Sequence, residues 1–195
     1  MIYIRNLVKS YGDKRILEIG ELSFSKGNIF SIYGRNGSGK TTLLNILGGV
    51  DFDFSGELII DFKKIGYVIQ FIENIICKRT IFEEVLSIVK DNDLAEVIID
   101  NLELNDVKSM NPLFLSSGQK RLLFLYSVFL VNDLILIDEP FINLDKKSKK
   151  LVVELFQTFK KKGKCIIYTT NRLNDTKIAN YILEIENGRI KKRDY

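Results

Sequence analysis

A glycine-rich loop is the first part of this sequence that could carry chemistry. Residues Gly34-Arg35-Asn36-Gly37-Ser38-Gly39-Lys40-Thr41 fit the pattern G-x-x-x-x-G-K-[ST] and stand between an apolar segment and an expected helix. The glycines let the backbone curl so that several N–H groups point at phosphate oxygens, and the helix start adds free donors. Lys40 can place a cation on the β- and γ-phosphates, and the Thr41 hydroxyl can bind Mg²⁺. The loop, with Thr42 after it, predicts a nucleoside triphosphate site.

Two carboxylates follow a second apolar run, LILIDEP at 134–140. Asp138 comes at the end of an expected buried strand, where it can hold Mg²⁺ directly or through water. Glu139 beside it can orient and deprotonate a water for attack on a γ-phosphate. A kinase of the phosphate-loop type needs the first carboxylate but no water-activating second one. Glu139 therefore favours hydrolysis over phosphoryl transfer to a small molecule.

A second small polar loop, LFLSSGQKR at 113–121, opens a long helical pattern far from the first loop. Ser116 and Gln119 have capping-box spacing, which predicts an exposed helix N-terminus. Such a terminus binds anions, but the phosphates of the first loop are held elsewhere in the chain. Helix capping accounts for part of this motif and leaves the pairing of Gly118 with Gln119 unexplained.

Composition and charge restrict the remaining possibilities. A chain of 195 residues with 46% hydrophobic and 28% charged residues fits one globular domain. The net charge of +4 gathers in short lysine runs, which fit solvated helix faces better than a nucleic-acid or membrane patch because no aromatic residues are interleaved. Histidine is absent, and Cys77 and Cys165 have no metal-site spacing and stand in apolar sequence surroundings. No signal peptide or membrane span is expected.

The elements that position these residues follow an α/β pattern. We expect β structure at the N-terminus, around 28–33, 58–61, 65–70, 134–137 and 165–170, and a hairpin at Asn187-Gly188. Helices are expected at 40–47, from a capping box at Thr80-Glu83 to about residue 104, and over 145–162. The prediction is one domain, 1–195, with a mixed sheet, an N-terminal antiparallel part and a small helical insertion at roughly 71–115.

Taken together, the motifs resemble those of the ATP-binding-cassette (ABC) ATPases, the motor subunits of ABC transporters. The resemblance covers essentially the whole chain, because the motifs occur in the family's order: Tyr11 before the first glycine turn, GRNGSGKTT, Gln70, LSSGQ at 115–119, LILIDEP and Asp145. A phosphate loop alone is moderately specific, whereas this combination is very specific. The resemblance implies ATP and Mg²⁺ as cofactors.

In that family two cassettes pack head to tail, and each LSSGQ-type loop covers the nucleotide held by the other subunit. The resemblance therefore implies that residues Ser116 to Gln119, including Ser117 and Gly118, complete a partner's site. It further implies that Tyr11 stacks on adenine and that Gln70 touches Mg²⁺ or the attacking water. Asp145 would bridge the two subunits, although an aspartate before KKSKK is also a natural helix N-cap.

Two positions depart from the family pattern. Ser117 replaces the first glycine of L-S-G-G-Q and adds a hydroxymethyl group near the partner's phosphate. Asn171 stands where the family has its switch histidine, and a neutral amide donates weaker hydrogen bonds than a charged imidazole. The resemblance thus implies an ATPase that is slow, with Lys40, Gln70, Glu139 and Asn171 as its catalytic residues.

These observations predict the ATP-hydrolysing subunit of an ABC transporter, working as a homo- or heterodimer on separate membrane subunits. Such a protein would be cytoplasmic and peripheral on the inner face of the cell membrane, without a nucleic-acid partner. The compact insertion and short C-terminal end favour an export-type cassette. Two alternatives stay open at this point: an ABC ATPase without a membrane partner, and a weakly hydrolysing module that dimerises on ATP, which Asn171 and Ser117 favour and Glu139 opposes.

Overall fold

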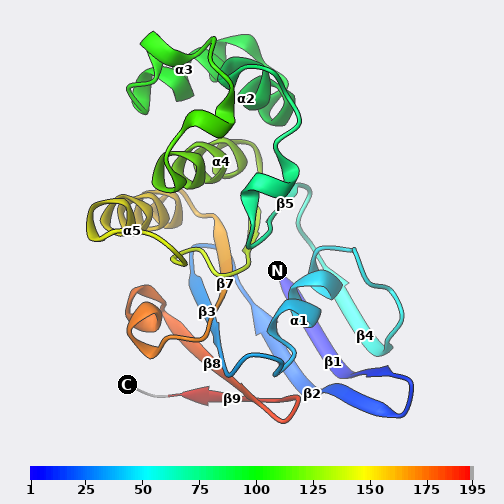
Figure 1. Ribbon diagram of the computed structural model, residues 1–195. Helices are drawn as coiled ribbons and strands as arrows, with labels where there is room; N and C mark the ends of the chain where they lie inside the picture. The colour runs from blue at the N-terminus through cyan, green and yellow to red at the C-terminus, as the bar shows by residue number, and fades with distance from the viewer. Residues whose placement is uncertain (194–195) are drawn as a thin grey trace.

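The computed structural model describes residues 1–193 and contains two β-sheets with helices around them (Figure 1). The smaller sheet is antiparallel, in the order β2-β1-β4, with β1 at Ile2–Tyr11, β2 at Lys14–Phe24 and β4 at Ser55–Ile60. The larger sheet has the order β5-β6-β7-β3-β8-β9. Its strands are β3 Ile29–Tyr33, β5 Ile65–Val68, β6 Leu134–Ile137, β7 Cys165–Thr170, β8 Tyr181–Glu186 and β9 Arg189–Arg193. All its pairs are parallel except β8 with β9, so the predicted mixed sheet with an antiparallel N-terminal part is confirmed.

The helices begin and end close to the sequence predictions. They are α1 Lys40–Leu47, α2 Ile81–Val89, α3 Asn92–Asn101, α4 Ser117–Val131 and α5 Lys146–Lys161, with short 3-10 turns η1 to η4 at 72–75, 105–107, 112–114 and 173–178. The capping box of Thr80 and Glu83 is present at the start of α2. The helical stretch expected up to residue 104 is divided into two helices, because Lys90 takes a left-handed conformation with φ of 57°.

The larger sheet is buried on both faces, which explains its continuous apolar strands. In β6, Leu134 and Leu136 belong to the hydrophobic cluster that contains α1 and the antiparallel sheet. Their neighbours Ile135 and Ile137 belong to the cluster that contains α4 and α5. Since alternate side chains of a strand point to opposite faces, α1 packs on one face of the sheet and α4 and α5 on the other.

A third hydrophobic cluster lies in the helical part drawn in green at the top of Figure 1. It joins α2 and α3 to Leu115 and to Leu123 of α4. Helix α4 also contributes Phe124 and Phe129 to the cluster under the sheet, so it contacts both the helical part and the core. The proposed subdomain limit at residue 115 stays a prediction, and α4 is the element that connects the two regions.

The structure also describes the helix lengths and the two cysteines on which the composition bears. Within residues 1–193, no helix combines the length and the apolar character needed to cross a membrane. The two cysteines differ in their surroundings: Cys165 is buried, as expected, whereas Cys77 is exposed. Of the apolar residues at 71–76, just before Cys77, only Ile72 of η1 is buried, and Cys77 itself lies exposed between η1 and α2. The apolar sequence before Cys77 therefore does not place its thiol in an apolar environment.

Candidate functional site

Strand order brings the phosphate loop, the two carboxylates and Asn171 to one edge of the larger sheet. Strand β3 lies between β7 and β8, and β7 pairs with β6, so the carboxyl ends of β3, β6 and β7 are neighbours. Tyr33 pairs with Thr170, and the Gly34 N–H donates to the Thr170 carbonyl over 3.2 Å. Residues that follow these three strands therefore meet, as expected at the carboxyl edge of an open α/β sheet.

The glycines of the 34–41 loop are required by close packing and by backbone conformation. A Cβ on Gly34 would lie 2.6 Å from the carbonyl oxygen of Ile185, which no side chain tolerates. Gly39 has φ of 102° and stands at the N-cap of α1, where no side chain of residues 1–193 caps the helix. The first N–H groups of α1 therefore have no side-chain acceptor, as in other helix starts that bind phosphate.

Lys40 is buried inside this loop. Its ammonium donates to the carbonyl oxygens of Gly34 and Arg35, both over 3.0 Å. Burial lowers the pKa of Lys40, while the carboxylates of Glu139 and Asp138 raise it. Lys40 is thus held by backbone oxygens of the phosphate loop, and two carboxylates lie close enough to affect its pKa.

Asp138 connects the ends of three elements. Its Oδ2 accepts from the Thr41 hydroxyl over 2.8 Å, and its Oδ1 accepts a short hydrogen bond from the Thr169 hydroxyl. The predicted pair of metal-ligating residues, Thr41 and Asp138, is therefore in direct contact. Thr169 was missed by sequence reasoning, because a threonine in the run CIIYTT also fits an ordinary buried strand. The signal that could have revealed it is a polar residue at the carboxyl end of an apolar strand, two residues before Asn171.

Glu139 follows Asp138 in a strained backbone conformation. Its φ is 49°, which is uncommon for a residue other than glycine, and its N–H donates to the Thr169 hydroxyl over 3.0 Å. Burial raises the pKa of the Glu139 carboxyl, with Lys40 opposing the shift. A half-buried carboxylate with a raised pKa, beside a buried lysine, has the properties of a general base.

The residues of the loop fit a phosphate-bearing ligand. The Ser38 hydroxyl oxygen is buried and has no hydrogen-bond partner among residues 1–193, although buried hydroxyls are normally paired. A hollow of about 620 Å³ is open beside it, lined by Gly34 to Ser38, by Lys14 to Ile16 and by Glu184 to Gly188. The Thr41–Asp138 pair supplies the oxygen ligands that Mg²⁺ prefers. The remaining predicted loop residue, Thr42, is half-buried in the first turn of α1.

Asn171 and Gln70 also lie at this edge. The Asn171 side-chain amide, directly after β7, donates to the Asn36 side-chain oxygen over 3.0 Å, so it contacts the phosphate loop. Gln70 follows β5, whose last residue Val68 accepts a hydrogen bond from the Asp138 N–H over 2.9 Å. Arg121 of α4 donates to the Gln70 carbonyl over 2.7 Å. This buried arginine was not singled out from sequence, although a charge inside an apolar helix pattern was the available signal.

The LSSGQ loop has an explanation within its own chain that the sequence did not reveal. Ser116 caps α4, and the Gln119 side chain accepts from the Ser116 N–H over 3.0 Å, which completes the predicted capping box. A Cβ on Gly118 would come within 2.2 Å of the Ser148 hydroxyl, because α4 and α5 start side by side. Glycine and glutamine are therefore both required by local packing and capping. The Ser117 hydroxyl donates to the Asn143 carbonyl over 3.5 Å.

Asp145 takes the N-cap position at the start of α5. Its carboxylate accepts from the Ser148 N–H over 2.7 Å, and this hydrogen bond lowers the pKa of Asp145. Asp145, Ser116 and Gln119 line a hollow of about 910 Å³ at the starts of α4 and α5. Within residues 1–193, no hydrogen bond joins Ser116–Gln119 to the phosphate loop. The two groups of predicted site residues are thus separate in one chain.

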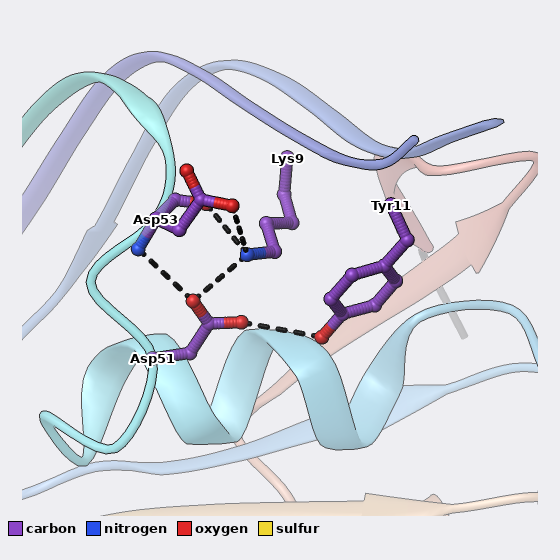
Figure 2. Close-up of polar contacts among 4 residues, drawn as sticks. All are labelled: Lys9, Tyr11, Asp51 and Asp53. Atoms are coloured by element: carbon purple, nitrogen blue, oxygen red, sulfur yellow. Dashed lines mark hydrogen bonds and ion pairs between the residues drawn. The ribbon is translucent and has the colours of Figure 1, made fainter. Parts of the chain in front are cut away.

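Tyr11 lies at the end of β1 and is 53% exposed. It is not among the described residues that line the hollow at the phosphate loop, although its strand partner Lys14 is. Its hydroxyl donates to Asp51 over 3.2 Å (Figure 2).

Three features of this chain together define an ATP-binding cassette. The phosphate loop after β3 lies near the carboxylate pair after β6, with β7 between the two strands. The chain also has an antiparallel N-terminal sheet and a helical part that bears LSSGQ. The sequence profile described as "ABC transporter" matches residues 17–142, more than half of the chain. The chain belongs to the ABC transporter family.

Relatives and solved structures agree with this assignment. The energy-coupling factor transporter ATP-binding protein EcfA1 of Fusobacterium nucleatum is 32% identical over 98% of this chain and 81% of its own length. The macrolide export ATP-binding/permease protein MacB of Campylobacter jejuni is 31% identical over 97% of this chain, which spans 33% of MacB. The ATP-binding cassette MJ0796, solved as a dimer bound to ADP and Pi, superposes with a TM-score of 0.86 at 25% identity, covering 100% of this chain and 98% of that one.

Proposed function

We propose that this chain is the ATP-hydrolysing subunit of an ABC transporter and that two cassettes form its active sites together. The observation that carries the proposal is the division of the site. Lys40, Asp138 and Glu139 lie together at the phosphate loop, whereas the helix start at Ser116 is separate from them. An exposed helix N-terminus with no anion of its own chain to bind is explained if it faces the nucleotide of a second cassette.

The residues at the phosphate loop have the chemistry that ATP hydrolysis needs. Mg²⁺ would neutralise charge on the phosphates, held by Thr41 and Asp138 with Gln70 as a further ligand. Lys40 would exchange the carbonyls of Gly34 and Arg35 for phosphate oxygens. Glu139 would accept the proton of the attacking water.

The other predicted contacts complete this proposal. Asn171, which donates to Asn36 in this chain, would donate to the γ-phosphate when ATP is bound. Ser117, Gly118 and Gln119 would cover the partner's nucleotide with Ser116, and Asp145 would bridge the subunits in addition to capping α5. The dimeric state of MJ0796 with ADP and Pi supports such pairing for this fold.

Exposed apolar residues support a further partner at the helical part. Phe71 beside Gln70 is 51% exposed, and Leu113 and Phe114 before the LSSGQ loop are 54% and 78% exposed. Apolar side chains exposed this far on one region are typical of a protein–protein contact. We propose that separate membrane subunits bind here, which would hold the chain at the cytoplasmic face of the membrane.

Relatives of this chain are named for uptake as well as for export. Relatives include a tungstate uptake protein, TupC of Peptoclostridium acidaminophilum, 27% identical over 99% of this chain, as well as MacB. The export-type assignment therefore stays a prediction from the sequence. The alternative of a weakly hydrolysing dimerisation module is favoured by one observation, the neutral Asn171 beside Asn36.

Replacing the proposed base tests the divided site. Glu139→Gln should still bind ATP but fail to activate water, so the chain should become a dimer that retains two ATP molecules. Light scattering with and without ATP-Mg²⁺ measures the mass, and nucleotide extraction measures the occupancy. Adding Ser116→Arg should return the protein to monomer, since the large cation would crowd the interface while ATP binding at Lys40 is kept.

A matched control is Glu57→Gln, which removes a carboxylate from the exposed strand β4. This variant should hydrolyse ATP as the unchanged chain does. A Glu139→Gln protein that binds ATP yet stays monomeric at high concentration would contradict the divided site.

A further inference from the structure

Lys9, Tyr11, Asp51 and Asp53 form a polar cluster beside α1, outside the residues that the proposed reaction uses (Figure 2). Lys9 and Tyr11 project from the same face of β1, and the two aspartates belong to the loop that follows α1. Of these four residues, only Tyr11 was predicted from the sequence to bind the nucleotide. The other three residues carried no motif.

Lys9 is buried, and its ammonium group is hydrogen-bonded within this cluster. The side chain is 2% exposed, and its ammonium donates to Asp51 Oδ1 over 2.8 Å, to the Asp53 carbonyl over 2.6 Å and to Asp53 Oδ2 over 3.2 Å. An ammonium has three N–H donors, and all three have acceptors here. A buried lysine paired in this way has one orientation, so its position relative to the neighbouring ring is fixed.

Asp51 links that lysine to the tyrosine. Its Oδ1 also accepts from the Asp53 N–H over 3.0 Å, and its Oδ2 accepts from the Tyr11 hydroxyl. The Lys9 ammonium lies over the Tyr11 ring, 4.7 Å from its centroid. Tyr11 is therefore held at its hydroxyl by Asp51 and on one face by Lys9.

Tyr11 is held at two points although about half of it is exposed. A purely structural connection between β1 and the loop after α1 needs only Lys9 and the aspartates. Holding the exposed Tyr11 ring as well is useful if the ring binds a flat partner. The side chain then has less conformational entropy to lose on binding. Lys9 therefore covers one face of the Tyr11 ring, and the rest of the ring is exposed.

The position of the ring relates it to the phosphate loop. Tyr11 pairs with Lys14 across the hairpin, and Lys14 to Ile16 line the hollow at that loop. Helix α1 starts from the phosphate loop and is followed by the loop that carries Asp51. One rigid helix of eight residues, about 12 Å long, therefore sets the spacing between the phosphate site and the residue that holds Tyr11.

We propose that Lys9 and Asp51 are positioning residues for nucleotide-base binding, which hold Tyr11 as a stacking platform for the base of the bound nucleotide. This inference rests on the proposed function, since it assumes that the phosphate loop binds a nucleotide. Stacking recognises the flat face of a base and tolerates different bases. The platform should therefore strengthen ADP and GDP binding alike and leave pyrophosphate, which has no base, unaffected.

The test compares dissociation constants for Mg-ADP, Mg-GDP and Mg-pyrophosphate by titration. Tyr11→Ala should weaken ADP and GDP about tenfold, within the range for loss of an aromatic stacking partner. Lys9→Met and Asp51→Asn should weaken both about threefold, and pyrophosphate binding should stay within twofold of the unchanged chain. Lys9→Met in the Tyr11→Ala background should have no further effect, because the residue it positions is gone.

A matched control is Lys162→Met, which removes a similar ammonium–ring contact, 4.9 Å from the Phe159 centroid, far along the chain. It should leave all three constants unchanged. Thermal unfolding of each variant checks folding, and Asp51→Asn serves if Lys9→Met does not fold.

The positioning role is overturned if Lys9→Met and Asp51→Asn leave ADP affinity unchanged, if they weaken pyrophosphate equally, or if the Lys9 and Tyr11 effects simply multiply. Failure of the proposed function gives a different result: the unchanged chain then binds neither ADP nor pyrophosphate.

Discussion

Asn171 stands where the family resemblance predicts a switch histidine. Its amide donates to Asn36 of the phosphate loop, so the side chain already points at the place where phosphates would bind. An imidazole at this position can take a proton and strengthen its hydrogen bonds, whereas an amide stays neutral. Residue 171 is therefore expected to limit the rate of hydrolysis without limiting binding.

Asn171→His should raise kcat several-fold with little change in ATP affinity. Losing one well-placed donor costs on the order of 3 kcal/mol in comparable sites, roughly a hundredfold in rate, and Asn171 retains part of that function. The measurement is kcat under saturating ATP-Mg²⁺. An equal or slower Asn171→His variant would contradict this role, and an Asn171→Ala variant as fast as the unchanged chain would mean that the side chain takes no part.

The raised pKa of Glu139 predicts the pH dependence of hydrolysis. A general base works when deprotonated, so kcat should fall as pH falls through the pKa of Glu139. Because burial raises that pKa above its ordinary value of 4.5, the loss should begin at a higher pH than for an exposed carboxylate. Arg172 lowers the pKa of Glu139, so Arg172→Met should move the acid limb of the kcat profile upward. A limb at or below 4.5 in the unchanged chain would contradict the assignment.

At the scale of elements, the starts of α4 and α5 are packed so closely that one of the two contacting residues must be a glycine. Gly118 leaves room for the Ser148 hydroxyl, and Asp145 and Ser116 cap the two helices from either side. Arg121 connects the same helix α4 to the backbone of Gln70. Helix α4 therefore contacts both the helical part and the segment that carries Gln70.

Gly118→Ala should destabilise the chain by about 1–3 kcal/mol, the usual cost of overpacking. The added methyl group would meet both the hydroxyl and the Cβ of Ser148, so Ser148→Gly should recover part of the loss, whereas Ser148→Ala should recover less. Urea unfolding measures the free energies. Gly20→Ala is the control, since nothing lies within 4 Å of that Cβ. A Gly118→Ala variant as stable as the Gly20 control would mean that the two helices separate easily.

Elements with strong local signals could be predicted from the sequence, and contacts between distant elements could not. The bounds of α1, β6 and β7 follow from apolar runs and from the glycine loop, and the structure confirms them. Strand order decides that Thr169 meets Asp138 and that Asn171 meets Asn36, and no local pattern encodes that order. The fit of Gly118 against Ser148 likewise depends on how two helices pack.

At the scale of the whole molecule, the two cysteines differ in exposure, so their reactivity can show whether the sheet opens. Cys77 is exposed before α2, whereas Cys165 is buried in strand β7 on the face that packs against α1, where burial raises the pKa of its thiol to about 12. A thiol reagent should modify Cys77 at once and Cys165 only on unfolding. Peptide mass analysis after timed labelling measures both rates, and Cys77→Ser is the control that leaves a single slow thiol. Rapid labelling of Cys165 in the native state would mean that the sheet opens readily.

The last strand of the larger sheet has a consequence for solubility. Strand β9 forms an edge, and its residues Arg189, Lys191, Lys192 and Arg193 are exposed cations. An open edge offers unpaired backbone groups to another chain, and charges along it oppose the edge-to-edge contact that leads to aggregation. These charges should therefore oppose the stacking of copies of this chain into fibrils, while the proposed pairing around ATP uses a different surface.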